Sequence, residues 1–326
     1  MRAAFYHENG AARDVLQVGE VETPTPGAGE VLVRIKASGV NPSDVKSRQG
    51  GPGRALAFPQ IVPHSDGAGI IEQVGKGVDK ARAGERVWIW NGQWKRPFGT
   101  AAEYIAVPAA QAVPLPDGVD FEAGACFGIP ALTAQHAVTI GGSVAGQRVL
   151  ITGGAGAVGH YAIQFAKMKG AEVITTISTP QKAEHARAAG ADHVINYKTQ
   201  DVGAAVKDIT GGAKVDRIID LDFGGNQFLI PTCLKPGGLV VVYGSNDMAP
   251  PLQILPLLVY GACVQFFIVY ELTAEDRDKG IADINTLITS DAMRHTIAAQ
   301  FSLEDIVKAH ELVESGTAMG NVVIHP

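Results

Sequence analysis

The sequence predicts an α/β protein with two parts, a β-barrel-like part followed by a doubly wound parallel sheet. Two observations carry this prediction. Before about residue 121, short alternating apolar segments are separated by Gly and Pro. From about residue 122, apolar strand-like runs alternate with helical stretches, a spacing that indicates parallel strands joined by right-handed crossovers. The 326 residues are enough for two domains with separate cores.

The first part shows the two-residue periodicity of half-buried strands. Val31, Val33 and Ile35 alternate with the side chains between them, and similar patterns recur nearby. The expected strands are Glu30–Ala37, Gly69–Val74, Glu85–Trp90 and Thr100–Val107. A short helix is expected at Ser43–Arg48. Short strands at this spacing favour a compact barrel.

The second part contains apolar runs separated by helical segments. The expected strands are Val149–Ile151, Val173–Ile177, His193–Asn196, Arg217–Leu221 and Leu239–Tyr243. The expected helices are Val158–Lys169, Pro180–Ala189, Asp201–Thr210, Gln227–Leu234, Thr273–Thr289 and Leu303–Glu314, with a last strand at Asn321–His325.

The first of these strands leads directly into a glycine motif. Gly154, Gly156 and Gly159 form Gly-x-Gly-x-x-Gly between the expected strand and helix. Dinucleotide sites use such glycines for a tight turn, for close approach of a diphosphate and for packing of helix against strand. We therefore expect the cofactor diphosphate to bind at residues 154–159, namely Gly154, Ala155, Gly156, Ala157, Val158 and Gly159. The alternative is a glycine-rich turn that binds nothing.

Composition narrows the function classes. A formal charge of −6 without a Lys/Arg cluster argues against a nucleic-acid partner. Cys126, Cys233 and Cys263 are too scattered for a disulfide framework or a zinc motif, and we expect them to be small core residues. No apolar leader or spanning segment is evident, which favours a cytoplasmic protein with no membrane partner.

The end of the second expected strand indicates which dinucleotide binds. NAD sites carry Asp or Glu about 20 residues after the glycines, where it bonds the ribose 2′-hydroxyl. This chain has Thr175-Thr176-Ile177-Ser178-Thr179 there, followed by Lys182. Hydroxyls and an ammonium without a carboxylate favour a 2′-phosphate, so the predicted cofactor is NADPH. The alternative for Lys182 is a solvated helix residue.

Several motifs spread over the chain resemble one known superfamily. They include Gly39-Val40-Asn41-Pro42-Ser43-Asp44, Pro63-His64-Ser65-Asp66-Gly67, Gly84-Glu85-Arg86-Val87, Gly99-Thr100-Ala101-Ala102-Glu103-Tyr104, Gly128-Ile129-Pro130-Ala131-Leu132-Thr133 and Gly320-Asn321-Val322-Val323-Ile324. Together with the glycine loop they resemble medium-chain dehydrogenases/reductases of the zinc-free quinone oxidoreductase (zeta-crystallin-like) branch. The resemblance implies a GroES-like catalytic domain at 1–121, a Rossmann NADPH-binding domain at 122–267, and a segment at 268–326 that returns to the catalytic domain.

The resemblance also assigns residues around the cofactor and the substrate. Asn41 and Thr133 match positions beside the nicotinamide, and Ser178, Lys182 and Tyr197 match residues that hold the 2′-phosphate. Further cofactor positions implied by the resemblance are Gly244, Ser245, Phe267, Val269 and Asn321. Trp90, Asn91 and Trp94 are expected to face a substrate cleft, whereas Trp88 is equally compatible with a core position.

Metal binding is not expected. Zinc enzymes of the superfamily place Cys where this chain has Asn41 and His where it has Ser65. An amide and a hydroxyl are poor zinc ligands beside thiolate and imidazole. His64 is offset by one residue and is interpreted as an ordinary hydrogen-bonded histidine. Asn41 itself has an alternative role, because Asn commonly stabilises its own turn.

These observations predict an NADPH-dependent oxidoreductase that transfers hydride to a quinone or an α,β-unsaturated carbonyl. The basic residues Lys46, Arg48 and Arg54 could favour an acidic substrate instead. We expect, however, that all three lie at the solvated surface. The alternative functions are a non-catalytic NADPH sensor, a crystallin-like structural protein and, less favoured, a zinc-free alcohol dehydrogenase. The β-prone run Val264–Tyr270 predicts a sheet edge that pairs in a homodimer.

Overall fold

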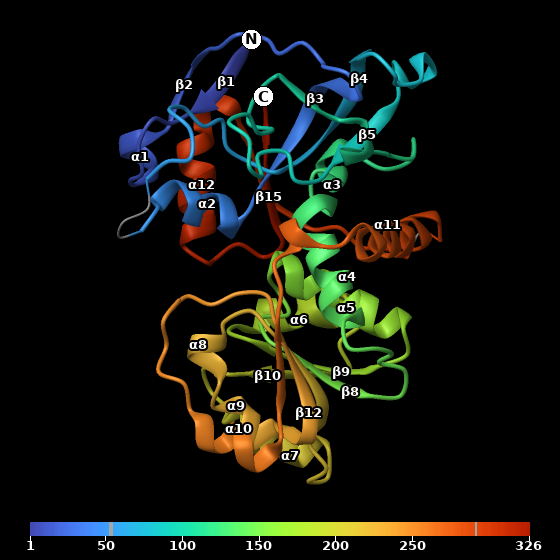
Figure 1. Ribbon diagram of the computed structural model, residues 1–326. Coiled ribbons are helices and arrows are strands. Elements are labelled where there is room, and N and C mark those ends of the chain that lie inside the picture. The colour runs from blue at the N-terminus through green and yellow to red at the C-terminus, as the bar shows by residue number, and fades with distance from the viewer. Residues whose placement is uncertain (52–54, 291) are drawn as a thin grey trace. The chain divides into compact units, whose positions relative to one another are not determined.

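The computed structural model describes residues 1–51, 55–290 and 292–326. Contacts divide the chain into two compact units, which Figure 1 shows as ribbons. The first unit comprises residues 1–130 and 295–326, and the second comprises residues 131–294. No helix of the described residues is long and apolar enough to cross a membrane.

The first unit is built on an antiparallel sheet. Its strands follow the order β14-β15-β3-β4-β5-β7, with β6 also paired to β3, and a separate hairpin joins β1 to β2. The bounds are β1 (Arg2–Phe5), β2 (Gln17–Glu20), β3 (Glu30–Val40), β4 (Asp66–Val74), β5 (Arg86–Ile89), β6 (Tyr104–Pro108), β7 (Ala112–Pro114), β14 (Ile297–Ser302) and β15 (Asn321–His325). The long strand β3 pairs with three neighbours. It pairs with β4 along most of its length, with β6 at its beginning and with β15 at its end.

Among the described residues, four helices and several short helical turns accompany this sheet. They are α1 (Ala12–Val15), α2 (Pro42–Gln49), α3 (Phe121–Gly124) and α12 (Ile306–Glu314), with a π-helical turn η3 at Phe127–Ala131 and 3₁₀ turns at Lys80–Arg82, Ala109–Gln111 and Leu303–Asp305. In Figure 1, α12 lies beside α2. One apolar cluster lies inside the strands, around Val33, Ile71 and Ile105, and another lies beneath α12, around Tyr6, Ile306 and Ile324.

The second unit contains a six-stranded sheet that is parallel throughout. Its order is β10-β9-β8-β11-β12-β13, so strands are added on one side of β8 up to β10 and on its other side from β11 onward, and the strand order reverses between β8 and β11. The bounds are β8 (Arg148–Ile151), β9 (Glu172–Ile177), β10 (His193–Asn196), β11 (Val215–Asp220), β12 (Leu234–Val242) and β13 (Cys263–Phe266). Ligands of such sheets bind at the carboxyl ends of the strands beside this reversal.

The connecting helices complete the doubly wound arrangement. They are α4 (Leu132–Thr139), α5 (Ala157–Met168), α6 (Pro180–Ala188), α7 (Val202–Ile209), α8 (Phe223–Asn226), α9 (Leu229–Cys233), α10 (Ile254–Tyr260) and α11 (Ala274–Thr289), with a 3₁₀ turn η4 at Val269–Glu271. The central strand β8 is fully buried at Val149, Leu150 and Ile151, as expected for a strand covered on both faces.

The α/β class and both sheets agree with the sequence prediction, whereas several elements differ. The expected strand at Thr100–Val107 begins only at Tyr104, and the expected helix at Gln227–Leu234 is replaced by α8 and α9 with a break between them. The apolar run Val264–Tyr270 forms a strand only to Phe266, and 3₁₀ turn η4 follows at Val269. The sequence analysis did not anticipate β1, β2, β14, α4 or α10.

The observed units also divide the chain at other residues than the expected domains do. Residues 122–130 belong to the first unit because α3 packs on β3, β4 and β5. Residues 268–294 belong to the second unit because α11 packs on α4, and only residues 295–326 join the first unit, where β15 pairs with β3. Cys126 and Cys233 are buried, but the expectation of a core position is wrong for Cys263, which lies exposed on the edge strand β13.

Candidate functional site

The glycine motif forms the turn between β8 and α5. Gly153 has φ +69°, a left-handed conformation that a side chain would oppose, and the Gly156 N–H donates to the Gly153 carbonyl over 3.0 Å. An added Cβ at Gly159 would overlap the Gly153 carbonyl oxygen, and one at Gly154 would overlap the Thr175 hydroxyl. Close packing of helix against strand therefore requires glycine at both positions.

The start of α5 has the features of an anion-binding site. Gly156 is the N-cap residue, and it brings no side chain that could accept from the first-turn N–H groups. The first residues Ala157, Val158 and Gly159 therefore present their N–H groups to a ligand instead of to a side chain. The helix dipole adds a partial positive charge at the same place. This end of α5 fits the diphosphate of a dinucleotide.

A buried carboxyl group that sequence reasoning missed supports this turn. Asp220 ends β11, and its Oδ1 accepts hydrogen bonds of 2.7 Å from the hydroxyl of Thr152 and from the amide of Asn226. Thr152 immediately precedes the glycine turn, and its hydroxyl in turn accepts from the Leu221 N–H. Burial raises the pKa of Asp220, and the neighbouring Asp222 raises it further. Asp220 therefore connects the ends of β8 and β11, the two strands between which the strand order reverses.

The residues expected at the 2′-phosphate lie at the neighbouring strand ends. Ser178 follows β9 directly, Tyr197 follows β10 directly, and the Tyr197 N–H donates to the Ile177 carbonyl over 3.0 Å. Lys182 lies in the first turn of α6, where its N–H donates to the hydroxyl of Thr179, the N-cap residue. The Tyr197 side chain is 48% exposed, so its ring is accessible to a ligand. These three positions are brought to one end of the sheet.

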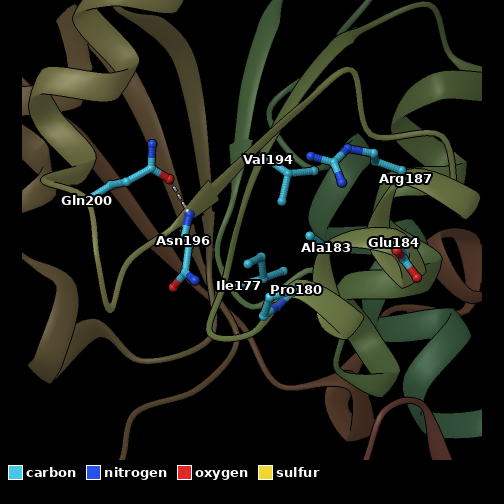
Figure 2. Close-up of a pocket in the computed structure, with 8 residues that line it drawn as sticks. All are labelled: Ile177, Pro180, Ala183, Glu184, Arg187, Val194, Asn196 and Gln200. Atoms are coloured by element: carbon cyan, nitrogen blue, oxygen red, sulfur yellow. Dashed lines mark hydrogen bonds between the residues drawn. The ribbon is translucent and has the colours of Figure 1, made fainter.

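A hollow of about 270 Å³ lies beside this end of the sheet, between α6 and β10. Figure 2 shows the side chains that line it. The Gln200 side chain closes one side of it by accepting from the Asn196 N–H over 2.8 Å. Its lining consists of Ile177, Pro180, Ala183, Glu184, Arg187, Val194, Asn196 and Gln200. Ser178, Lys182 and Tyr197 are not among the lining residues, although Ile177 and Asn196, which directly precede Ser178 and Tyr197, are.

Other expected cofactor residues also lie in the second unit. Gly244 follows β12, where an added Cβ would lie 2.5 Å from the Leu221 carbonyl oxygen, and the Ser245 hydroxyl accepts from the Gly224 N–H. The Phe267 N–H donates to the carbonyl of Val242, and Val269 is buried in the 3₁₀ turn. Thr133 is buried in α4. Asn321 differs, because it lies in the first unit, where its backbone and side-chain N–H groups both donate to the Thr296 carbonyl.

In the first unit, Asn41 lies at the junction of β3 and α2. Its backbone N–H donates to Asp44 Oδ2 over 2.8 Å, and its side chain accepts from the Asp44 N–H, which forms a capping box. The Asn41 Nδ2 also donates to Asp66 Oδ2 over 2.8 Å. Burial raises the pKa of Asp44 to about 7 and raises the pKa of Asp66 well above its usual range. Sequence reasoning named Asn41 but missed both carboxyl groups.

The aromatic residues separate into core and loop. Trp88 lies on β5 with no exposed surface and contacts the Phe127 ring edge-on, as expected for a core residue. Trp90, Asn91 and Trp94 follow the end of β5, and Asn91 has φ +53°. The same loop is bonded to the residue directly before β4, because the Gly92 N–H donates to the Ser65 carbonyl over 2.8 Å. The cleft-lining role of these three residues remains a prediction.

The basic residues near Asn41 differ from expectation. The prediction that Arg48 is solvated at the surface is wrong, since its side chain is fully buried and forms an ion pair with Glu314. Packing of α2 against α12 explains this, because Glu314 lies on α12. Lys46 is exposed, and Arg54 lies outside the described residues. Arg48 is therefore occupied by a structural contact.

His64 is buried within a hydrogen-bonded chain. Its Nδ1 lies 2.9 Å from the Ser38 hydroxyl, and its Nε2 lies 3.0 Å from Nε2 of His310 on α12. Burial lowers the pKa of both histidines, that of His310 to about 3. Among the residues that the structure describes, no group of three or more His, Cys, Asp or Glu side chains is arranged to hold a metal ion.

Two known families match the two units. The alcohol dehydrogenase GroES-like domain matches residues 27–117, and the zinc-binding dehydrogenase family matches residues 157–285. A 2-haloacrylate reductase from a Burkholderia species is 31% identical over 99% of this chain and 98% of its own length. The chain belongs to the quinone oxidoreductase branch of the medium-chain dehydrogenase/reductase superfamily.

Other relatives agree with this assignment. Quinone oxidoreductase 1 of Escherichia coli strain K12 is 31% identical over 98% of both chains. The crystal structure of Escherichia coli quinone oxidoreductase complexed with NADPH superposes with a TM-score of 0.90, at 29% identity and over the full length of both chains. These similarities support an NADPH-dependent reductase.

Proposed function

We propose that this protein is an NADPH-dependent reductase that transfers hydride to a carbon–carbon double bond conjugated with a carbonyl group, in a quinone or an α,β-unsaturated carbonyl compound. The cofactor supplies the hydride. The protein binds and orients both partners and stabilises the negative charge that develops on the carbonyl oxygen.

The N-terminus of α5 is the observation that carries this proposal. It combines glycines that permit close approach with first-turn N–H groups that no side chain caps. The neighbouring strand end offers Ser178 and Lys182 without a carboxylate that would repel a 2′-phosphate. Both features are those that NADPH needs, and NADPH is the bound cofactor of the structural relative described above.

The choice of acceptor rests on chemistry that the relatives share. Quinones and 2-haloacrylate both contain a double bond conjugated with a carbonyl group. Hydride added at the far carbon of such a system produces an enolate or a hydroquinone anion, and a water proton then completes the reduction. A hydrogen-bond donor suffices to stabilise this anion, and the Asn41 carboxamide supplies one.

Metal independence is part of the proposal. The Asn41 carboxamide already accepts from the Asp44 N–H and donates to Asp66, so its oxygen is engaged in capping α2. Ser65 offers only a hydroxyl, which is a poor zinc ligand.

The test is NADPH oxidation at 340 nm by purified protein, with a panel of 1,4-benzoquinones, 1,4-naphthoquinones, enones and 2-chloroacrylate. We expect turnover with at least one conjugated acceptor and a clear preference for NADPH over NADH. Saturated ketones serve as controls, since they lack the conjugated double bond. Stoichiometric NADPH binding without turnover of any acceptor would favour the non-catalytic alternative.

We further propose a homodimer formed through the edge strand β13. Phe266 on this strand is 61% exposed, and α10, which precedes this strand in the chain, exposes Leu255, Leu258 and Val259. An open apolar edge of this kind favours aggregation unless another strand covers it. Light scattering should give the mass of a dimer, and Phe266→Lys should give that of a monomer. A monomeric mass for the unmodified protein would contradict the proposal.

We also place the protein in the cytoplasm, where its three free cysteines would remain reduced.

A further inference from the structure

Two loops at the carboxyl end of the parallel sheet are joined by a pair of hydrogen bonds. Asp222 lies in the loop after β11, and Asn246 lies in the loop after β12. Asp222 Oδ1 accepts from the Asn246 backbone N–H over 2.7 Å, and Asp222 Oδ2 accepts from the Asn246 side-chain Nδ2 over 2.9 Å. One carboxylate therefore holds both the backbone and the side chain of the same residue, which fixes the start of the second loop.

The Asp222 carboxylate is not used by its own helix. Asp222 is the N-cap residue of α8, a position at which Asp commonly accepts from the first-turn N–H groups. Within the described residues its carboxylate makes no such capping bond and instead reaches Asn246, 24 residues further along the chain. An added Cβ on Gly225 would lie 2.7 Å from Asp222 Oδ2, so glycine leaves room for the carboxylate in this orientation. The carboxylate therefore serves the contact between the two loops.

Neutral contacts hold the same two loops on either side of this pair. The Gly224 N–H donates to the Ser245 hydroxyl over 3.1 Å, and the Gln227 side chain accepts from the Gln253 N–H over 2.9 Å. Hydrogen bonds to a carboxylate are roughly twice as strong as such neutral ones. Removal of the Asp222 carboxylate should therefore loosen the second loop more than removal of either neutral contact.

The second loop begins where the cofactor is expected. Ligands of doubly wound sheets bind at the carboxyl ends of the strands beside the reversal of strand order, which here lies between β8 and β11. Gly244 and Ser245 directly precede Asn246, and the resemblance implies that both contact the cofactor. An added Cβ on Gly244 would lie 2.5 Å from the Leu221 carbonyl oxygen, so the two loops approach closely at this point. The position of Asn246 thus determines the position of this stretch of backbone.

We propose that Asp222 is a positioning residue for NADPH, which acts through Asn246 by holding residues 244–246 in the conformation that binds the cofactor. This inference rests on the proposed function and adds a residue to it. The contribution of Asp222 is to keep the loop ordered before NADPH arrives, so that cofactor binding does not have to supply the free energy of ordering it.

The test compares Asp222→Ala, Asp222→Asn, Asn246→Ala and the double variant Asp222→Ala/Asn246→Ala. The apparent Kd rises in inverse proportion to the population of the binding-competent conformation. We expect Kd for NADPH, measured by fluorescence titration, to rise about tenfold in Asp222→Ala, and KM for NADPH to rise with it. The kcat at saturating NADPH and the melting temperature should change little, because bound cofactor restores the loop conformation.

The conservative and double variants separate positioning from a general structural effect. Asp222→Asn can keep both contacts, because its amide accepts from the Asn246 N–H and donates to the Asn246 side-chain oxygen once that second amide turns over. This variant should recover most of the affinity. Asn246→Ala keeps the backbone contact and should raise Kd less than Asp222→Ala does. If Asp222 acts through Asn246, then Asn246→Ala adds no further loss in the Asp222→Ala background.

Asp216→Ala is the matched control, because Asp216 lies near the opposite end of β11 and its carboxylate also holds two donors. Its Oδ2 accepts from the Arg148 backbone N–H over 2.8 Å, and its Oδ1 accepts from Lys235 Nζ over 2.6 Å. This control should leave Kd for NADPH unchanged. Hydrogen exchange of residues 244–253 gives a readout independent of turnover. Exchange should be faster in Asp222→Ala than in the unmodified protein, and NADPH should slow it in both.

Two outcomes would overturn the inference. One is an unchanged Kd for NADPH in folded Asp222→Ala, and the other is an equal loss of affinity in Asp216→Ala. Should Asp222→Ala fail to fold, Asp222→Ser takes its place, since its hydroxyl is too short to hold both donors. Failure of the proposed function would appear in the unmodified protein, as NADPH binding without reduction of any conjugated acceptor, and it would leave the effect of Asp222 on Kd in place.

Discussion

The buried pair His64–His310 should make the first unit unstable in acid. The two imidazoles stack with centroids 5.2 Å apart and share one hydrogen bond between their Nε2 atoms. His310 comes from α12, 246 residues away from His64 in the sequence. Burial and the charge of Arg48 lower the pKa of His310 to about 3. The folded protein therefore keeps this ring neutral at a pH where the unfolded chain protonates it.

The perturbation is His310→Phe, which keeps a planar ring against His64 and removes the titrating group. The unfolded pKa of histidine is about 6.5, so between pH 7.5 and pH 5 the unfolded chain gains most of one proton and the folded protein gains almost none. Because the unfolded state binds more protons, stability is lost as pH falls below about 6.5. Integrating over this range gives a loss of about 2 kcal/mol for His310 alone.

Two other contributions must be separated from this effect. The raised pKa values of Asp44 and Asp66 act in the opposite direction, because at pH 5 the folded protein keeps these carboxyl groups protonated where the unfolded chain has already ionised them, so their contribution to stability falls as pH rises. His310→Phe also removes the hydrogen bond to His64, which costs about 1 kcal/mol at every pH. Neither changes the comparison, because the relevant quantity is how the difference in stability between the two proteins varies with pH.

The assay is urea unfolding at pH 5, 6 and 7.5, followed by tryptophan fluorescence. All three tryptophans, at positions 88, 90 and 94, lie in the first unit, so the signal reports on the unit that contains the histidine pair. We expect the unmodified protein to lose about 2 kcal/mol more than His310→Phe between pH 7.5 and pH 5. Parallel pH profiles for the two proteins would refute this account of the buried pair.

Three further predictions concern the cofactor and metal sites. Lys182→Ala should weaken NADPH binding roughly tenfold to a hundredfold, because it removes a charge-assisted hydrogen bond, and it should leave NADH binding nearly unchanged. Equal affinity of the unmodified protein for NADPH and NADH would count against the assignment. Gly159→Ala should weaken NADPH binding in a fluorescence titration by about tenfold or more, since its Cβ would lie 2.9 Å from a loop Cα, whereas Gly118→Ala, with open space around it, should not. With Asn41 and Ser65 at the ligand positions, elemental analysis should find no stoichiometric zinc, and about one zinc per chain, lost with activity on chelation, would contradict this prediction.

Features encoded over short stretches of sequence were predictable. The turn from β8 through Gly154, Gly156 and Gly159 into α5 depends on residues within about one dozen positions, and the structure has it at the expected place. The strands β10 and β15 have the predicted bounds. By contrast, α4 was missed because Leu132 to Val138 are all buried, which removes the polar face that makes a helix recognisable.

Tertiary structure alone decided which polar side chains meet. Asn41 and Asp66 are 25 residues apart, Thr152 and Asp220 are 68 apart, and Arg48 is bonded to a carboxylate 266 residues away. The sequence pattern around each of these residues does not reveal its partner, because periodicity reports only the strand or helix to which a residue belongs. The sequence by itself thus determined the cofactor loop and the alternation of strands and helices in a doubly wound parallel sheet. Burial and partner choice, which set the charge states around Asn41 and the glycine turn, followed only from packing these elements against one another.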